Sequence, residues 1–198
     1  MSFEEKNEYW SETFEGLDFS CEEIVGKEFD GCAFKECNFS EATLQRCNFV
    51  DCEFTKCNLS VVNIEYSKFS DVLFNESKLI GINWTKVSWS SFVFCSPIKF
   101  YKSIVNDSSF YGLSLQEIVF EECKAHDVDF RQGNFIDANF TYTDLTGSNF
   151  SNTNLSGADF SEATNYDIDI SQNKIRRAIF SRFEAVRLLD SLEIELVD

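Results

Sequence analysis

The sequence predicts an all-β protein, a solenoid of square coils in which each turn has four short sides. The main observation is a period of five, because an apolar residue stands at the centre of nearly every five-residue group from Phe14 to Phe180. The chain has 22 Phe residues, and all but Phe3, Phe92 and Phe183 stand at these centres. Glycine recurs two residues after a centre, where a corner needs positive φ. An α-helix needs apolar spacings of three and four, and a half-buried strand needs a spacing of two, so neither fits.

The period is clearest in residues 127–163, which read DVDFR, QGNFI, DANFT, YTDLT, GSNFS, NTNLS, GADFS. Asp or Asn precedes each centre, and a small residue usually stands two positions before it. The centres are Phe130, Phe135, Phe140, Leu145, Phe150, Leu155 and Phe160. We expect the chain to turn a corner after each group, so that four groups close one coil and coils stack at about 4.8 Å.

The period begins at Phe14 and runs without a break to Phe94. It resumes one residue late at Phe100, and the slip contains the only proline, Pro97. This register predicts two separate Phe ladders. The first contains Phe34, Phe54, Phe74 and Phe94, and the second contains Phe100, Phe120, Phe140, Phe160 and Phe180. The final centres are expected at Asn165, Ile170, Ile175 and Phe180.

Four segments follow from this pattern. They are an N-terminal extension (1–11), an N-terminal half of the solenoid (12–96), a C-terminal half after the slip (97–182), and a C-terminal helix and tail (183–198). In the first coil Glu12, Glu22 and Lys27 replace the small inward residue, which indicates a polar cap. The slip predicts a bulge or kink, and a surface bulge and a functional hinge both remain open.

Residues 182–193, RFEAVRLLDSLE, have the apolar spacing of an amphipathic α-helix, and an extended tail, IELVD, follows. The helix is expected either to cover the last coil or to associate with a second copy, because it has two apolar stripes. The residues expected at a homodimer interface are Phe183, Val186, Leu189, Leu192, Ile194 and Leu196.

The chain is acidic, with 34 Asp and Glu, 17 Lys and Arg, and a net charge of −17. This balance disfavours direct binding to nucleic acid or to an anionic membrane. It favours a basic partner, or a partner built to hold nucleic acid. The N-terminus, MSFEEKNEYW, has no apolar leader, and no stretch is long enough to span a membrane, so a cytoplasmic location is expected.

The acidic residues are densest between Glu121 and Asp169, where ten of them stand against Lys124 and Arg131, a net charge of −8. With the stacking rise this is about one charge per 1.5 Å, close to about one per 1.7 Å for duplex DNA. A solubilising surface is the alternative. The residues expected to carry the partner-binding charge are Glu121, Glu122, Asp127, Asp129, Asp137, Asp144 and Asp159.

No metal, cofactor or catalytic site is expected. Zinc sites usually contain Cys-x2-Cys pairs, which are absent, and the repeat places six cysteines at the small inward position. These are Cys32, Cys37, Cys47, Cys52, Cys57 and Cys123. His126, the only histidine, is expected to point to solvent without a nucleophile or a paired base. Trp84 and Trp89 are expected in the core.

The pattern of a small inward residue, Asp or Asn, central Phe or Leu and two variable residues resembles the pentapeptide-repeat family motif over nearly the whole chain. That resemblance implies a right-handed quadrilateral β-helix. Within the family the chain resembles the topoisomerase-poison resistance group, which includes quinolone-resistance and microcin-immunity proteins. It is most similar to the albicidin-resistance type. Four segments carry this similarity: GINWT (81–85), NDSSFYGL (106–113), NYDIDI (165–170) and LLDSLEIELVD (188–198).

The resemblance implies a non-enzymatic homodimer, joined through the C-terminal helix, whose acidic rod resembles duplex DNA. Such a protein would bind DNA gyrase or topoisomerase IV where DNA lies and protect the enzyme from poisons. Quinolone-resistance proteins of the plasmid type have two projecting loops, and the period here predicts no insertion longer than one residue. An acidic scaffold for another basic partner is the alternative function, and an enzyme is a third hypothesis for which the uninterrupted repeat leaves little sequence.

Overall fold

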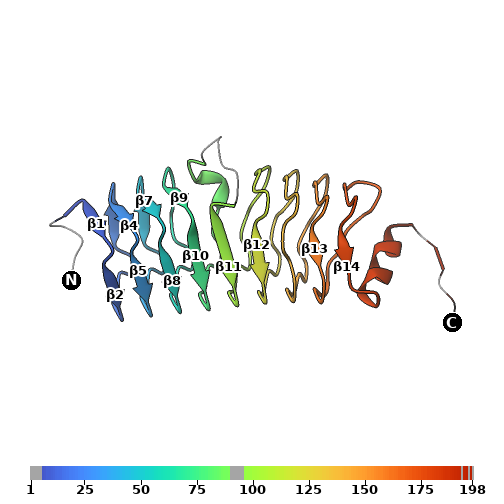
Figure 1. Cartoon of the computed structure of the whole chain (residues 1–198), viewed down its shortest axis with the longest axis horizontal. Helices are drawn as coiled ribbons and strands as arrows, with labels where there is room; N and C mark the ends of the chain where they lie inside the picture. Colours follow the sequence, from blue (N-terminus) through green and yellow to red (C-terminus); the bar gives the residue numbers. More distant parts are fainter. Residues whose placement is uncertain (1–5, 90–95, 193, 196, 198) are drawn as a thin grey trace.

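The computed structural model describes residues 6–89, 96–192, 194, 195 and 197, and it is a rod of about eight stacked coils (Figure 1). The strands are two to four residues long. They are β1 (Glu8–Trp10), β2 (Thr13–Glu15), β3 (Glu23–Val25), β4 (Glu28–Asp30), β5 (Ala33–Lys35), β6 (Thr43–Gln45), β7 (Asn48–Val50), β8 (Glu53–Thr55), β9 (Lys68–Ser70), β10 (Val72–Asn75), β11 (Ile98–Tyr101), β12 (Val119–Glu121), β13 (Asp159–Phe160) and β14 (Ile179–Phe180). Two 3₁₀ helices, η1 (Trp84–Lys86) and η2 (Glu184–Leu192), complete the described elements.

The coils have four sides, which we name A to D in chain order. Side A is the six-stranded sheet β12-β11-β10-β8-β5-β2, followed by the pair β13-β14. Side B is formed by isolated parallel bridges, such as Asp18 with Asn38 and Asn38 with Asn58. Side C begins with the pair β3-β6, and side D with the sheet β1-β4-β7-β9. Every pairing is parallel and joins neighbouring coils, so the predicted all-β square solenoid is confirmed.

The core is a set of aromatic ladders that run along the rod. Phe34 stacks on Phe54 with ring centroids 4.5 Å apart, and Phe120 stacks on Phe140 with an interplanar angle of 1°. Rings on adjacent sides meet edge to face, as Phe29 does with Phe34 at 73°. Both arrangements are favourable for aromatic quadrupoles, which explains the preference of this repeat for Phe.

The small residue two positions before a centre bonds to the coil below. Ser77 Oγ donates to the Phe54 carbonyl at 3.1 Å, and Cys52 Sγ donates to the Phe29 carbonyl at 3.4 Å. The six inward cysteines are buried, and burial raises the pKa of Cys52 and Cys123 to about 12. The thiols of Cys52 and Cys123 therefore stay neutral, and all six cysteines are small buried core residues, as the sequence indicated.

Residues two positions after a centre turn the corners in the left-handed conformation. The seven glycines at this position have positive φ, and so do acids such as Glu36, Asp51 and Asp127. This conformation costs a non-glycine residue about 1 kcal/mol or more. The cost is offset by backbone hydrogen bonds to the next coil, such as Asp51 N–H to the Ser70 carbonyl at 2.9 Å.

The predicted register is wrong at the middle of the rod. Phe54 pairs with Phe74, twenty positions later, whereas Phe74 pairs with Phe100, twenty-six positions later. One coil is therefore six residues longer than its neighbours, not one, and the two expected Phe ladders are a single ladder on side A. The sequence pattern could not reveal the longer coil, because six added residues move the next centre by only one position within the five-residue period. Phe94, expected in the first ladder, lies outside the described residues.

The boundaries of the repeat also differ from the prediction. Tyr9 lies in β1 and stacks on Phe29 at 5.1 Å, so the coils begin within the expected extension 1–11. In the last coil Asn165 is exposed and left-handed, while Tyr166 and Ile168 are buried. Asn149 pairs with Asp167 only eighteen positions later, whereas Asn154 pairs with Lys174 at twenty again, so only side C of this coil is offset, by two residues. The expected centres Asn165 and Ile170 are therefore wrong.

The C-terminal helix is present, but it is a 3₁₀ helix rather than the expected α-helix. Phe183, Val186, Leu189 and Leu192 recur at every third position, which places them in one row when a helix has three residues per turn. Leu188 packs against the core, so the helix covers part of the last coil. Among the described residues, no helix is long and apolar enough to cross a membrane.

Candidate protein-binding surface

The seven acidic residues predicted to carry the charge are distributed around the rod rather than along one side. Glu121 and Asp159 lie on side A, Asp144 on side B and Asp129 on side C, while Glu122, Asp127 and Asp137 occupy three different corners. The density of charge between Glu121 and Asp169 therefore encircles the coils. The surroundings of each carboxylate therefore decide whether it is available to a partner.

Three of these carboxylates are held by neighbouring side chains, and the first, Glu121, accepts a hydrogen bond from Asn139 Nδ2 at 3.1 Å. Asp129 accepts two hydrogen bonds from Arg131, both at 2.8 Å, and these bonds hold the Asp129 pKa below its usual value. Asp144 lies 2.8 Å from His126 Nε2, so His126 is paired rather than free in solvent as predicted. A carboxylate that already accepts hydrogen bonds from a neighbouring side chain has fewer free acceptor positions for a binding partner.

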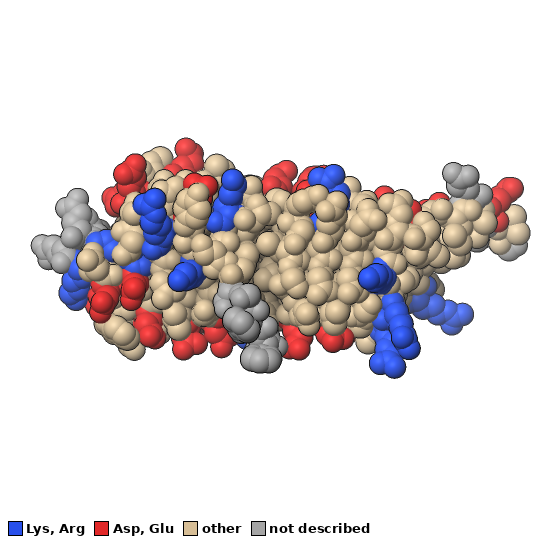
Figure 2. All heavy atoms as spheres, turned by 90° about the horizontal axis from the view of Figure 1, so that it is seen from above, with Lys and Arg blue, Asp and Glu red and all other residues tan. Residues whose placement is uncertain are grey.

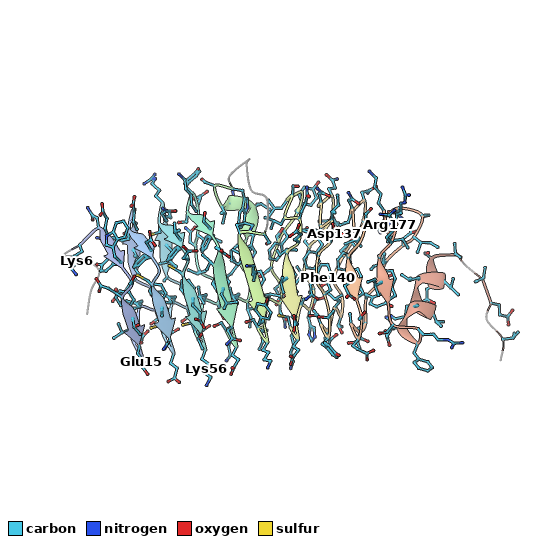
Figure 3. All side chains as sticks on the ribbon, in the orientation of Figure 1. Lys6, Glu15, Lys56, Asp137, Phe140 and Arg177 are labelled. Atoms are coloured by element: carbon cyan, nitrogen blue, oxygen red, sulfur yellow. The ribbon has the colours of Figure 1, made fainter. Side chains whose placement is uncertain are left out.

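Asp127 and Asp137 are more available. Each is an exposed corner residue, and its carboxylate leans over the corner glycine of the next coil, Gly147 or Gly157. A Cβ at either glycine would collide with the carboxylate. Figure 3 shows Asp137 on the outside of the coils near the C-terminal half. The missing side chain above each acid leaves its carboxylate open to an approaching protein.

Each of these two acids belongs to a row of acids that share one corner, although Pro97 interrupts the first row and Val61 and Gly81 interrupt the second. The D/A row, between sides D and A, consists of Asp51, Asp71, Glu117 and Asp137. The B/C row, on the opposite corner, consists of Glu41, Asp107 and Asp127. All seven are exposed. Figure 2 shows Asp and Glu side chains along both long edges of the molecule.

Within the described part of the chain, only Asp71 among these seven forms an ion pair, with Lys99 at 3.0 Å. Asp107 and Asp127 occupy successive coils, about 4.8 Å apart. Like charges directly opposite one another on neighbouring strands destabilise a sheet. The rows therefore oppose folding, which is unexpected for residues with a purely structural role.

The other two corners differ. The A/B corner mixes signs, with Glu36, Lys56, Glu76, Lys102 and Glu122 in successive coils. The C/D corner carries Arg46, Tyr66 and Lys86, and Glu65 beside the corner pairs with Lys86 at 3.9 Å. Figure 2, which looks onto this corner, shows few acids in the middle of the C-terminal half. The acidic surface is thus confined mainly to two opposite edges.

The charge changes sign near the C-terminal end, as the sequence indicated. The exposed basic residues there are Lys174, Arg176, Arg177 and Arg182. Arg177 occupies the same corner as the D/A row and ends it (Figure 3). A long basic partner groove would therefore match the rod up to this point and not beyond.

The residues expected at a dimer interface leave an uncovered apolar surface. Phe183 is 91% exposed, and Val186, Leu192 and Ile194 are about half exposed. Leu189 is partly buried, and Leu196 lies outside the described residues. An exposed Phe in a row of aliphatic residues is typical of a contact surface.

The described residues contain no group of three or more His, Cys, Asp or Glu placed to hold a metal ion. A polar hollow of about 430 Å³ near the C-terminal end is lined by residues such as Asn149, Asp167, Asp169 and Arg187. Trp84 is buried and stacks on Phe110, and Trp89 packs at the core edge, as expected.

The repeat is also recognisable by comparison with known proteins. The pentapeptide repeat region family matches residues 27–96 and 94–160, which together make up more than half of the chain. The chain belongs to the pentapeptide repeat family. No curated protein matches the sequence.

Two solved pentapeptide repeat structures are similar to this one. HetL from the cyanobacterium Nostoc sp. strain PCC 7120, a protein involved in heterocyst differentiation regulation, is 11% identical with a TM-score of 0.68, covering 89% of this chain and 88% of HetL. A trypsin-treated form of QnrB1, a plasmid-mediated fluoroquinolone resistance protein, is 20% identical with a TM-score of 0.50, covering 96% and 92%. At these identities the likeness establishes the fold.

Sequence reasoning found Asp127 and Asp137 but missed the other row members. The signal was a spacing of twenty at the corner position, as between Asp51 and Asp71 or Asp107 and Asp127. The longer coil interrupts it, because Asp71 and Glu117 are forty-six positions apart. Only the observed register aligns the two halves of each row.

Proposed function

We propose that this pentapeptide repeat protein binds a type II topoisomerase, DNA gyrase or topoisomerase IV, in place of DNA and protects the enzyme from a topoisomerase poison. The observation that carries the proposal is the pair of acidic rows on opposite corners of a straight rod. The two phosphate strands of a duplex also present charge along a rod. A basic groove built for DNA is the partner that best complements this pattern.

The proposed binding residues are the two rows, together with Glu121, Glu122, Asp129, Asp144 and Asp159 around them. Asp129 and Asp144 contribute charge mainly at long range, since Arg131 and His126 occupy their carboxylates. The exposed row acids are better placed for direct contacts with Lys or Arg. Rim charges of this kind chiefly raise the association rate.

The six-residue addition bears on which poison is resisted. A single extra residue would have been too short for a projecting loop, but the register between Phe74 and Phe100 adds six residues and makes one possible in length. We propose no contact for this segment. The proposal therefore covers resistance to albicidin as well as resistance to a fluoroquinolone.

We further propose that the protein is a homodimer joined through η2 and the tail. The uncovered row of Phe183, Val186 and Leu192 supports this, because exposed apolar surface of this kind is usually buried by a partner. A second copy placed end to end would lengthen the rod. The longer acidic rod would then match a longer tract of duplex.

An acidic scaffold for another basic partner is the second candidate, since the fold alone does not specify a function. It is favoured by the Lys and Arg residues at the A/B and C/D corners, which a strict DNA mimic does not need. Affinity capture from the host extract separates the two candidates. Topoisomerase subunits among the captured proteins support the first, and their absence supports the second.

The direct test is a supercoiling assay with purified protein, with and without albicidin or a fluoroquinolone. We expect partial inhibition of supercoiling by the protein alone and rescue of activity in the presence of a poison. A variant with Asp51, Asp71, Glu117 and Asp137 changed to their amides is the matched control and should do neither. No inhibition and no rescue by the wild type at stoichiometric excess would rule the function out.

A further inference from the structure

The A/B corner carries an exposed aromatic ring between two carboxylates. Tyr142 is 62% exposed, and Glu122 and Glu162 occupy the same corner in the coils below and above it. Neighbouring coils are about 4.8 Å apart, so the two acids are next to Tyr142 on the corner, and one oxygen of Glu162 accepts a hydrogen bond from Ser181 Oγ at 3.0 Å. Glu122 and Tyr142 line an open hollow of about 520 Å³.

The same rod shows how such a group is occupied. On side C the guanidinium of Arg131 lies 5.6 Å from the centre of the Tyr111 ring and donates to both oxygens of Asp129 at 2.8 Å. An aromatic face together with a carboxylate is therefore a working arginine site in this molecule. A guanidinium is well suited to it because it stacks on rings and binds carboxylates through two N–H groups.

Earlier on the A/B corner the chain supplies the cation itself. Glu36, Lys56 and Glu76 stand at this corner in successive coils, so a lysine takes the middle position between two acids. In the later triplet, Glu122, Tyr142 and Glu162, the middle residue is a tyrosine instead of a lysine. Among the described residues no cation lies over this ring, and the contact that Glu122 makes with Lys102 is long, at 3.8 Å between exposed groups. Exposed pairs of this length contribute little.

We propose that Tyr142, Glu122 and Glu162 form a receptor for an arginine side chain of the protein partner. The ring supplies the stacking face and the two carboxylates supply the hydrogen-bond acceptors. The inference rests on the proposed function only for the identity of the protein that carries the arginine. It makes the A/B corner, which the two acidic rows leave aside, a specific contact point of the complex.

Tyr66 provides the matched control for the ring. It is also an exposed corner tyrosine, at 57%, but Arg46 and Lys86 stand in its corner where Tyr142 has acids. Stacking on an exposed tyrosine is available at both positions, but Glu65 beside Tyr66 is paired with Lys86 at 3.9 Å, whereas acids occupy both neighbouring corner positions of Tyr142. Glu36→Gln with Glu76→Gln is the control for the acids, because it removes the same charge from the same corner.

The first experiment needs no topoisomerase. The full-length protein is labelled with 3-fluorotyrosine, its ¹⁹F resonances are assigned through Tyr→Phe variants, and N-acetylarginine amide is titrated. We expect the Tyr142 signal to shift and to saturate while the Tyr66 signal does not. N-acetylcitrulline amide, which is neutral, and the E122Q/E162Q protein should show no such shift. Equal shifts at Tyr66 and Tyr142, or an equal effect of citrulline, would overturn the inference.

The second experiment measures binding of the same variants to purified gyrase and topoisomerase IV. Y142A and E122Q/E162Q should weaken binding about tenfold, while Y66A and E36Q/E76Q should stay within about twofold. Wild-type affinity of Y142A would contradict the inference and leave the proposed function standing. Arginine binding at Tyr142 without binding of either enzyme would contradict the proposed function and leave the arginine site standing.

Discussion

Asp144 is held in its ionised form by the packing of three coils. Burial alone would raise its pKa, but hydrogen bonds from Asn165, Thr146 and His126 outweigh burial and place the pKa below its usual range. A carboxyl with a lowered folded-state pKa adds stability above its unfolded pKa of about 4. That contribution is lost as the pH falls further, through the folded-state pKa.

Asp144→Asn should therefore lower stability by about 1 kcal/mol at neutral pH, and the difference from the wild type should shrink below about pH 4. Thermal unfolding across this pH range is the measurement. Asp51→Asn serves as the control, because Asp51 is an exposed corner acid outside any ion pair of the described residues. A deficit for Asp144→Asn that is the same at all pH values would contradict this account.

Substitutions at two corner glycines distinguish the cost of a left-handed backbone from the effect of displacing a carboxylate. Gly112 and Gly147 have similar φ, +68° and +72°, but a Cβ at 112 meets open space and a Cβ at 147 meets the Asp127 carboxylate. Gly112→Ala should cost about 1 kcal/mol from the left-handed backbone alone. Gly147→Ala should cost more and should also weaken partner binding by displacing Asp127. Equal losses of stability and no effect on binding would show that Asp127 has no role.

At the scale of the element, the pattern of five predicted the sides, the inward Phe residues and the corner glycines, because each depends on local spacing. It did not predict the register across the longer coil, since a phase of five cannot distinguish one added residue from six. The two-residue offset of side C in the last coil was missed for a similar reason, because Tyr166 and Ile168 alternate as in a strand and leave Asn165 at the corner. The acidic rows depend on the register, and so they became visible only with the fold.

The C-terminal element was predicted as amphipathic, and its apolar row is exposed as the dimer hypothesis requires. Leu192→Asp should convert a dimer to a monomer in sedimentation experiments, because a charge would be buried in an apolar contact. Val61→Asp changes an equally exposed aliphatic residue on the rod and should leave the association state unchanged. A monomeric wild-type protein, or a dimeric Leu192→Asp variant, would contradict the dimer.

At the scale of the whole molecule, the two acidic rows should oppose stability and support binding. Asp107→Asn with Asp127→Asn removes a repulsive pair from one corner and should raise the midpoint of thermal unfolding by a few degrees. The same variant should bind a topoisomerase more weakly, chiefly through a slower association rate that is sensitive to salt. If the acids served only to keep the surface soluble, the variant would be more stable but would bind the topoisomerase as the wild type does. The combination therefore distinguishes a binding surface from a solvated one.

The central claim is that this protein and duplex DNA occupy the same groove of the enzyme. Competition between the purified protein and a labelled linear duplex for gyrase and for topoisomerase IV tests it most directly. We predict mutual displacement, which should be lost when Asp51, Asp71, Glu117 and Asp137 are changed to amides. Simultaneous binding of the protein and the duplex to one enzyme, with neither reducing the affinity of the other, would contradict the account.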